Sequence, residues 1–259
     1  MAVSWKATVH SAMGTRHQQR GVPCQDYGDY VTRDASIVGA VADGAGSAKF
    51  SDIGAQLAVK TVLSNLEGWL ARQSSLEQEV IEGQVQSIFE SALDATVLAL
   101  DQEAQAGGYA LRELGCTLLT FIATPNWIAA MQIGDGFIVA QTSEADPYQL
   151  LFQPEKGEYI NETVFVTSEQ ALDAMQVVVK SGVQPLVCAA TDGLEKVAIR
   201  FHDWQPHAPF FAPFKSCLQT MDVPEERQTY LETFLNSDRL NAKTDDDKTL
   251  LMCLCEQGP

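Results

Sequence analysis

The sequence predicts an α+β fold in which antiparallel sheets are covered by helices. Apolar runs of strand length are grouped in blocks, and pairs of helix-length patterns separate them, in the order strands, two helices, strands, two helices, strand. Regular strand–helix alternation, which is typical of a parallel doubly wound sheet, is absent from this order. With 259 residues and 46% hydrophobic content, the chain can bury a large core, and we expect one domain over 1–259.

The first part of the chain is expected to hold two strands and then two long helices. Val3–Val9 and Ser36–Ala42 are short apolar runs of strand type. From Ser51 onward, apolar residues recur at helical spacing. A serine and a glutamine at capping-box spacing then predict a second helix from about 75 to 105.

The second part of the chain is expected to be rich in strands before two further helices. Turn residues punctuate its apolar runs, and Pro224 has the preference of proline for a first helical position. The expected elements are a meander of antiparallel strands over 115–166, a strand pair over 177–190, helices over 207–218 and 224–235, and a final strand over 248–255.

The charge balance excludes several classes of partner. The formal net charge is −17, with 17 Lys and Arg scattered among 34 acidic residues, so we expect no nucleic-acid binding, which needs a basic surface. No apolar run approaches the roughly 20 residues of a membrane span, and the first residues lack a signal-peptide pattern. We therefore expect a cytoplasmic protein without membrane contact, with its six cysteines as free thiols.

Five aspartates lie at the ends of apolar runs in five separate segments. Glycines adjoin several of them, and carboxylates gathered with close backbone approach can hold hard cations such as Mn²⁺ or Mg²⁺. Taken singly, an Asp-Gly pair is as readily a turn or a helix cap. Together they favour a metal site made of Asp26, Asp43, Asp135, Asp192 and Asp246.

The order of six motifs resembles the metal-dependent Ser/Thr protein phosphatases of type 2C (PPM). The resemblance runs from about residue 11 to 254 and implies a four-layer α-β-β-α sandwich, with two antiparallel sheets flanked by helix pairs, as a single type 2C phosphatase-like catalytic domain. The motifs are Ser11–Gly14 with Gln25-Asp26, Val41–Gly46, Gly115–Leu118, Ile133–Gly136, Thr191–Leu194 and Asp246–Thr249.

The resemblance also implies roles for these residues. Two or three Mn²⁺ or Mg²⁺ ions would be held, and a hydroxide bridging two of them would attack the phosphoester directly. Asp135 would help to hold the third, weaker ion. The two tightly held ions would be surrounded by the catalytic residues Asp43, Asp192 and Asp246, together with Asp26 and the backbone carbonyl of Gly44.

The assignment at the last motif depends on register. Asp246 stands three residues before Thr249, as the metal-binding acid of the family does, and Asp245 is the alternative. Neighbours on an extended segment face opposite ways. We therefore expect Asp245 and Asp247 to point away from the site or into solvent.

The chain departs from the family pattern at two positions. The family places a phosphate-binding arginine soon after the first glycine, where this chain has His17, so the candidates for phosphate binding are His17, Arg16 and Arg20. In many relatives a histidine follows Asp-Gly and can protonate the leaving group, whereas this chain has Ala45. Water would then be the proton donor, which suits good leaving groups.

The function implied by the resemblance is hydrolysis of phosphoserine or phosphothreonine on a partner protein. The partner would be a cognate Ser/Thr kinase or its target, and the role would be in signal transduction. Two alternatives remain open at this point. One is a pseudophosphatase that binds a phosphoprotein or kinase without turnover, and the other is a hydrolase of small phosphoesters.

Overall fold

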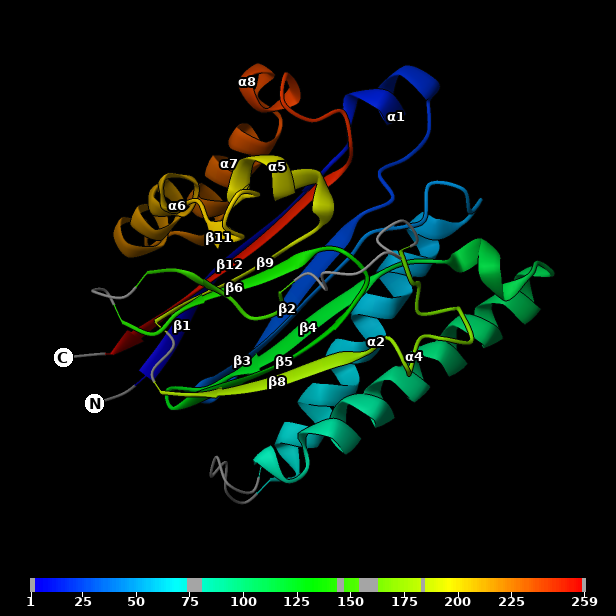
Figure 1. Ribbon diagram of the computed structural model, residues 1–259, viewed down its shortest axis with the longest axis horizontal. Coiled ribbons are helices and arrows are strands. Elements are labelled where there is room, and N and C mark those ends of the chain that lie inside the picture. Colours follow the sequence, from blue (N-terminus) through cyan, green and yellow to red (C-terminus); the bar gives the residue numbers. More distant parts are fainter. Residues whose placement is uncertain (1–2, 74–80, 144–146, 154–162, 183–184, 258–259) are drawn as a thin grey trace.

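Two five-stranded antiparallel sheets are stacked face to face, and helices cover the outer face of each (Figure 1). This computed structural model describes residues 3–73, 81–143, 147–153, 163–182 and 185–257. The layers run helix, sheet, sheet, helix. The predicted α+β sandwich of four layers is confirmed.

The first sheet contains the strands nearest both ends of the chain. Its order is β1-β12-β9-β6-β7, and β1 pairs with β12 from Val3↔Gln257 to Ala12↔Lys248. Both termini therefore lie at the same end of the sandwich (Figure 1). The strand bounds are β1 Val3–Ala12, β12 Lys248–Gln257, β9 Leu186–Ala190, β6 Phe137–Gln141 and β7 Gln149–Leu150.

The second sheet has the order β2-β3-β4-β5-β8. Every residue of β3 and of β4 is buried, as expected for central strands that are covered on both faces. The strand bounds are β2 Tyr27–Arg33, β3 Ser36–Ala42, β4 Leu118–Ala123, β5 Trp127–Ile133 and β8 Gln176–Ser181.

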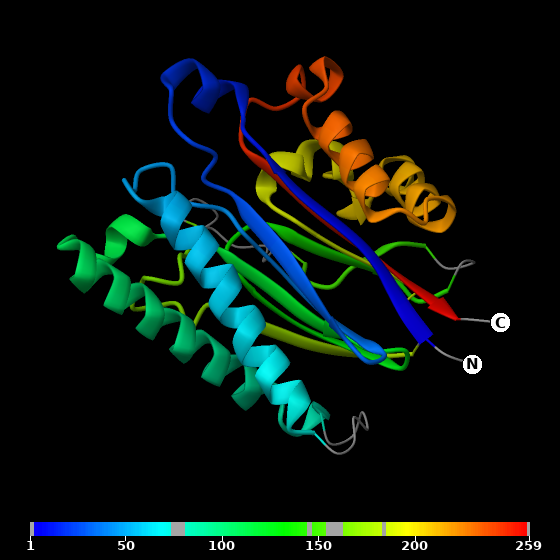
Figure 2. The ribbon, with the colours of Figure 1, turned by 180° about the vertical axis from the view of Figure 1, so that it is seen from behind.

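Long helices form the two outer layers. α2 (Ser51–Ala71) and α4 (Val85–Gly107) pack on each other and cover the second sheet, as Figure 2 shows from behind. α6 (Ala208–Thr220) and α7 (Pro224–Leu235) cover the first sheet. The short elements are α1 Thr15–Arg20, η1 Leu111–Leu114, η2 Asp192–Leu194, α5 Glu195–Ala198, β10 Ile199–Arg200, β11 Gln205–Pro206 and α8 Asp238–Asn241.

Three apolar cores hold the layers together. One lies between α2, α4 and the second sheet, one between the two sheets, and one between the first sheet and α6 and α7. Side chains crowd Gly39 between the sheets, because a Cβ there would lie 2.5 Å from both Leu251 of the first sheet and the Phe121 ring of the second. Only glycine fits this position without a shift of its neighbours.

The structure corrects several predicted elements. The meander does not continue beyond β5, because the chain crosses at Gly134–Gly136 into the other sheet. The strands predicted over 177–190 are not a pair, since β8 lies beside β5 while β9 lies between β12 and β6. Thr163–Val166 is not a strand, and the sequence prediction missed β2. The start of the helix predicted from 75 lies outside the described residues.

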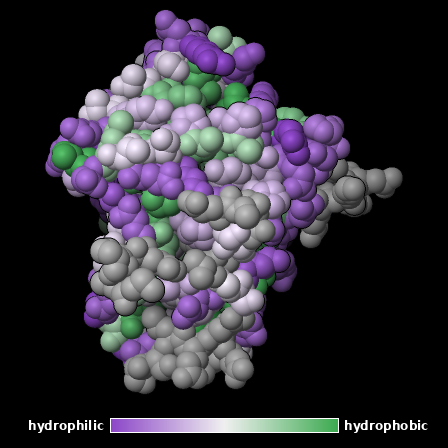
Figure 3. Space-filling model, turned by 90° about the vertical axis from the view of Figure 1, so that its left-hand side faces the viewer, coloured by the Kyte–Doolittle hydropathy of each residue, from purple (hydrophilic) through white to green (hydrophobic). Residues whose placement is uncertain are grey.

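No helix among the described residues is both long and apolar enough to cross a membrane. On the face drawn in Figure 3, the described hydrophobic residues lie in small separate patches among hydrophilic ones.

Candidate metal centre

The sheet register brings the predicted acidic residues to one end of the sandwich. Tyr27 pairs with Ala42, so Asp26 before β2 and Asp43 after β3 lie side by side. Ala190 of β9 pairs with both Leu250 and Phe137, which brings Asp192, Asp246 and Asp135 to the neighbouring strand ends. Pairing between distant segments therefore assembles the site.

Three of these residues form the centre of the site. One carboxylate oxygen from each of Asp43, Asp135 and Asp192 lies within 4.8 Å of the other two. We call these three residues the carboxylate cluster. Three convergent carboxylates form an oxygen-only donor set of the kind that Mg²⁺ and Mn²⁺ prefer.

Asp26 lies beside the cluster and retains a free ligand atom. Its side chain is buried, its Oδ2 accepts a 2.6 Å hydrogen bond from Thr191 Oγ1, and it lies close enough to Asp43 for the charge of Asp26 to raise the pKa of Asp43. Its Oδ1 is buried without a partner among the described residues. A buried carboxylate oxygen without a partner is unfavourable, and a cation would satisfy it. The donor set therefore fits the divalent ions that the family resemblance implies.

Backbone hydrogen bonds to Thr117 hold Asp43. The Asp43 N–H donates to Thr117 Oγ1 over 2.9 Å, and the Thr117 N–H donates to the Asp43 carbonyl over 2.8 Å. The next residue, Gly44, is closely surrounded: its N–H donates to the Gln25 carbonyl, and an added Cβ would lie 2.7 Å from that same oxygen. Glycine is therefore required where the chain passes Gln25.

A capped turn presents Asp135. Gly134 has a φ of 104°, which favours glycine, and the Gln132 side-chain amide donates 3.0 Å hydrogen bonds to the carbonyls of Gly134 and Gly136. Thr163 reaches the same acid from the segment after β7, since its Oγ1 donates to Asp135 Oδ2 over 2.6 Å. An ion at this carboxylate would compete with the Thr163 hydroxyl.

Burial and mutual repulsion raise the pKa values of the carboxyl groups in the metal-free site. Burial is the largest cause at Asp26 and at Asp43, and each group also feels the charges of nearby acids. Burial, then Asp135 and Asp246, raises the pKa of Asp192 to about 6. Burial and the charges of Asp192 and Asp135 raise that of Glu195 to about 7. A bound cation would reverse this penalty, because it favours the ionised form.

Asp246 lies at the edge of the site and pairs with Arg16. The Arg16 Nη2 donates to Asp246 Oδ1 over 2.8 Å, and both side chains are partly exposed. The Arg16 N–H also donates to the Asp245 carbonyl over 3.0 Å. Asp246 is outside the carboxylate cluster, but its charge raises the pKa of Asp192, which places it near that acid.

His17 and Arg20 differ from Arg16 in their surroundings. The His17 side chain is 8% exposed, and its Nδ1 lies 2.9 Å from Asp247 Oδ2. This burial argues against direct phosphate binding by His17, because its Nδ1 faces Asp247 instead of a substrate. Arg20 is exposed in the last turn of α1.

The structure corrects one expectation for the residues flanking Asp246. Asp245 is exposed, as expected, but Asp247 is buried, with only 3% of its side chain accessible. The chain bends at Asp246, so Asp245 faces solvent while Asp247 faces the interior. The amino end of α1 and the segment before β2 cover the interior face, as the hydrogen bonds from Gly14 and Gln25 to Asp247 show.

The buried side chain of Lys248 lies close to several of the acidic residues. Its Nζ donates to Asn241 Oδ1 over 3.1 Å and to the Asp246 carbonyl over 3.3 Å. Burial lowers the pKa of Lys248, while the charges of Asp247, Asp26 and Asp246 oppose that shift. The positive charge offsets part of the repulsion within the site.

Sequence reasoning missed several residues around the site. Gln132 was visible as an amide two residues before the Gly-Asp-Gly turn, and Glu195 as an acid three residues after Asp192. Thr163 could not be predicted, because nothing in the sequence around it indicates contact with Asp135, 28 positions earlier.

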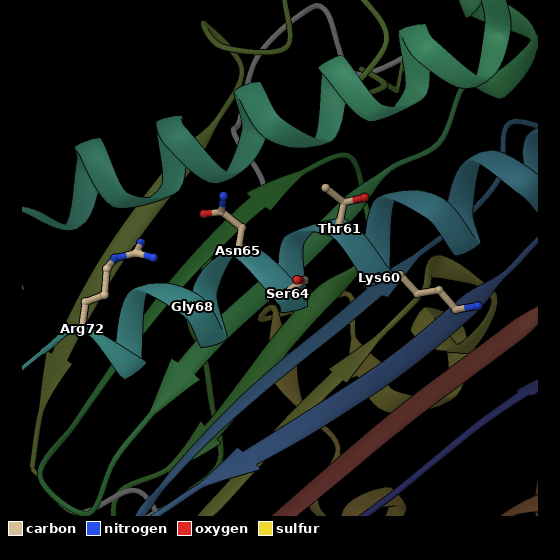
Figure 4. Close-up of a pocket in the computed structure, with 6 residues that line it drawn as sticks. All are labelled: Lys60, Thr61, Ser64, Asn65, Gly68 and Arg72. Carbon is tan, nitrogen blue, oxygen red and sulfur yellow. The ribbon is translucent and has the colours of Figure 1, made fainter. Parts of the chain in front are cut away.

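A shallow depression on α2 is separate from this site. Lys60, Thr61, Ser64, Asn65, Gly68 and Arg72 line it, and Figure 4 shows them along one helix. It contains none of the predicted metal-binding residues. It therefore supplies no part of the metal centre.

Comparison with known proteins identifies the family. The family model described as protein phosphatase 2C matches residues 13–236. The chain is 32% identical to serine/threonine-protein phosphatase 3 of Escherichia coli (strain K12) over 263 residues, which cover 97% of this chain and 99% of that protein.

Solved structures have the same fold at low sequence identity. A bacterial serine phosphatase superimposes with a TM-score of 0.65 at 14% identity, over 99% of this chain and 100% of that one. The serine/threonine phosphatase Stp1 from Staphylococcus aureus gives 0.63 at 14% identity, over 98% and 96%. Family model, full-length relative and fold agree with the motifs and their geometry. The chain therefore belongs to the protein phosphatase 2C family, the metal-dependent serine/threonine phosphatases that its motifs resemble.

Proposed function

We propose that this protein is an active phosphatase, dependent on Mn²⁺ or Mg²⁺, that hydrolyses phosphoserine or phosphothreonine on a partner protein. The observation that carries the proposal is the convergence of Asp43, Asp135 and Asp192 within 4.8 Å beside the unpartnered oxygen of Asp26. A chain that only bound phosphoproteins would have no chemical reason to keep these mutually repelling acids together.

The acidic residues would hold two ions, and Asp135 a weaker third. When bound, such an ion pair lowers the pKa of a shared water and supplies hydroxide in line with the phosphorus–oxygen bond. Asp43 is central to the arrangement, because it contacts Asp26 on one side and belongs to the carboxylate cluster on the other. No protein nucleophile is needed.

Arg16 is the best candidate for phosphate binding. Its Nη2 contacts Asp246, and its Nε is buried without a hydrogen-bond partner among the described residues. An unsatisfied guanidinium donor at the edge of an acidic metal site can bind a phosphate oxygen with directional hydrogen bonds. The pairing with Asp246 would hold the guanidinium in place before substrate arrives.

The leaving group would take its proton from water. Ala45 follows Asp43-Gly44 and is buried, and it cannot donate a proton. We therefore expect a steep dependence of turnover on the leaving-group pKa, with aryl phosphates cleaved faster than alkyl phosphates.

The test measures turnover of p-nitrophenyl phosphate and then of a phosphothreonine peptide, with Mn²⁺, with Mg²⁺ and with EDTA. We expect metal-dependent hydrolysis of both substrates and none by Asp43→Asn. Hydrolysis of the small ester alone, across a panel of phosphopeptides, would indicate a small-molecule phosphoesterase. Metal binding by calorimetry without any turnover would indicate a pseudophosphatase.

The natural substrate is a separate question, and we propose a cognate Ser/Thr kinase or a protein phosphorylated by it. Phosphorylated candidate kinases would be incubated with the enzyme and with Asp43→Asn. Loss of phosphate with the wild type alone would support a candidate, and retention of phosphate would remove it.

A further inference from the structure

Asp247 connects three segments that meet at the site. Its Oδ1 accepts a 2.6 Å hydrogen bond from the Gly14 N–H, and its Oδ2 accepts a 2.6 Å bond from the Gln25 N–H and lies 2.9 Å from His17 Nδ1. A carboxylate only accepts, so the His17 Nδ1 carries the hydrogen. Three donors thus converge on one buried anion whose two neighbours, Asp245 and Asp246, are less buried.

The bond to Gly14 places the turn that carries Arg16. Gly14 lies so close to Asp245 and Asp246 that an added Cβ would collide with their backbone. From this start, the Arg16 N–H reaches the Asp245 carbonyl and its guanidinium reaches Asp246. His17 follows directly and returns to Asp247, so bonds on both sides of Arg16 fix its backbone.

The bond to Gln25 positions a second segment, which carries Asp26 and contacts Gly44. Asp26 follows Gln25 directly, and the Gln25 carbonyl accepts the N–H of Gly44, the predicted carbonyl ligand. The same short segment therefore connects Asp247 to two predicted metal ligands. The charge of Asp247 also raises the pKa of Asp26, which confirms that the two acids are close.

We infer that Asp247 is a positioning residue that holds Arg16 and Asp26 together at the carboxylate cluster. The expected change in KM rests on the proposed function. The expected change in Mn²⁺ affinity does not. Asp247 is not a member of the carboxylate cluster. Its effect passes through backbone N–H groups, as outer-shell partners act on the ligands of other metal sites.

Asparagine cannot replace this carboxylate. An amide of the same shape has one acceptor oxygen, and its NH₂ group would face either the Gly14 N–H or the Gln25 N–H. Either the Gly14 N–H loses its partner, or the Gln25 N–H and His17 Nδ1 lose theirs, and the segment that carries the released donor shifts. Asp247→Asn should therefore weaken Mn²⁺ binding, or raise KM, by about tenfold to a hundredfold, depending on which donor is released.

A double-mutant cycle separates positioning from general destabilisation. KM for p-nitrophenyl phosphate and Kd for Mn²⁺ would be measured on Arg16→Ala, Asp247→Asn and the double variant, with Asp94→Asn, an exposed acid on α4, as the control. If Asp247 acts on phosphate through Arg16, its effect on KM disappears in the Arg16→Ala background. Its effect on Mn²⁺ affinity remains there.

Three outcomes would overturn the inference. The KM effects of Arg16→Ala and Asp247→Asn could multiply fully while Mn²⁺ affinity is unchanged. Asp247→Asn could lower thermal stability alone, with KM and Kd at wild-type values. If Asp247→Asn does not fold, His17→Gln and His17→Ala are compared instead, because the glutamine amide can still donate to Asp247 and alanine cannot. The third contrary outcome is then a loss of Mn²⁺ affinity in His17→Gln as large as that in His17→Ala.

Failure of the proposed function would look different. In that case the wild type would bind Mn²⁺ without turning over either substrate. The calorimetric comparison of wild type with Asp247→Asn would still decide whether Asp247 positions the metal ligands.

Discussion

Asp192→Asn should stabilise the metal-free protein and destabilise the metal-loaded one. In the folded chain without metal, burial and neighbouring acids raise the pKa of Asp192 from 3.8 to about 6. Ionising the folded group at pH 7.5 therefore costs about 3 kcal/mol more than ionising it in the unfolded chain. Asparagine has the same shape, can still accept the Gly193 N–H, and carries no charge to bury.

The sign of the pH dependence follows from the raised pKa. Between pH 3.8 and about 6 the folded state binds more protons than the unfolded state, so the stability of the wild type falls as pH rises through this window. The advantage of Asp192→Asn should be absent near pH 4 and complete by pH 7.5. For a chain of this size, 3 kcal/mol corresponds to a rise in Tm of about 6 °C.

Added Mn²⁺ should invert the order. Ions at a hundred times their Kd stabilise the wild type by about 2.7 kcal/mol for each site, whereas the variant has lost a ligand. Differential scanning fluorimetry in EDTA and in Mn²⁺, at pH 4.5 and 7.5, measures all four states, with Asp94→Asn as the control. A variant that is less stable than the wild type in EDTA at pH 7.5, or a difference that does not depend on pH, would refute the account of the site.

Four further substitutions test individual roles. Asp43→Asn should lower p-nitrophenyl phosphate turnover by several orders of magnitude while the circular dichroism spectrum stays native, and wild-type rates in Mn²⁺ would remove the proposed centre. Asp135→Ala should retain tight Mn²⁺ binding by calorimetry yet lose phosphopeptide turnover, and loss of the tight sites would place Asp135 in the ion pair. Arg16→Ala should raise KM about tenfold to a hundredfold and Arg20→Ala should leave it near the wild-type value, as steady-state kinetics would show; the reverse would assign phosphate to Arg20.

The sequence by itself determined the order of the elements and the chemistry of the site. Strand and helix periodicity is local, so the buried runs at Ser36–Ala42 and Leu186–Ala190 and the pattern from Ser51 could be read directly. The acids at strand ends were equally visible, because aspartate beside glycine is a local signal. Their convergence followed from the family resemblance, and the structure brings Asp43, Asp135 and Asp192 together.

Only the tertiary structure decided which strands pair. β8 and β9 follow each other closely in sequence, yet they lie in different sheets, and β5 and β6 are separated in the same way. Periodicity identifies a strand but carries no information about its partner, because pairing depends on segments far away in the chain.

The same limit applies to the residues around the metal centre. Alternation along the chain predicted that Asp245 and Asp247 share a side, but the chain bends at Asp246, so Asp245 is exposed and Asp247 faces the interior. The interior side exists because Gly14, His17 and Gln25, more than 200 positions earlier, fold over Asp247. A residue's partners are a property of the packed chain, and for Asp247 they turn an apparent surface acid into the link between two sides of the site.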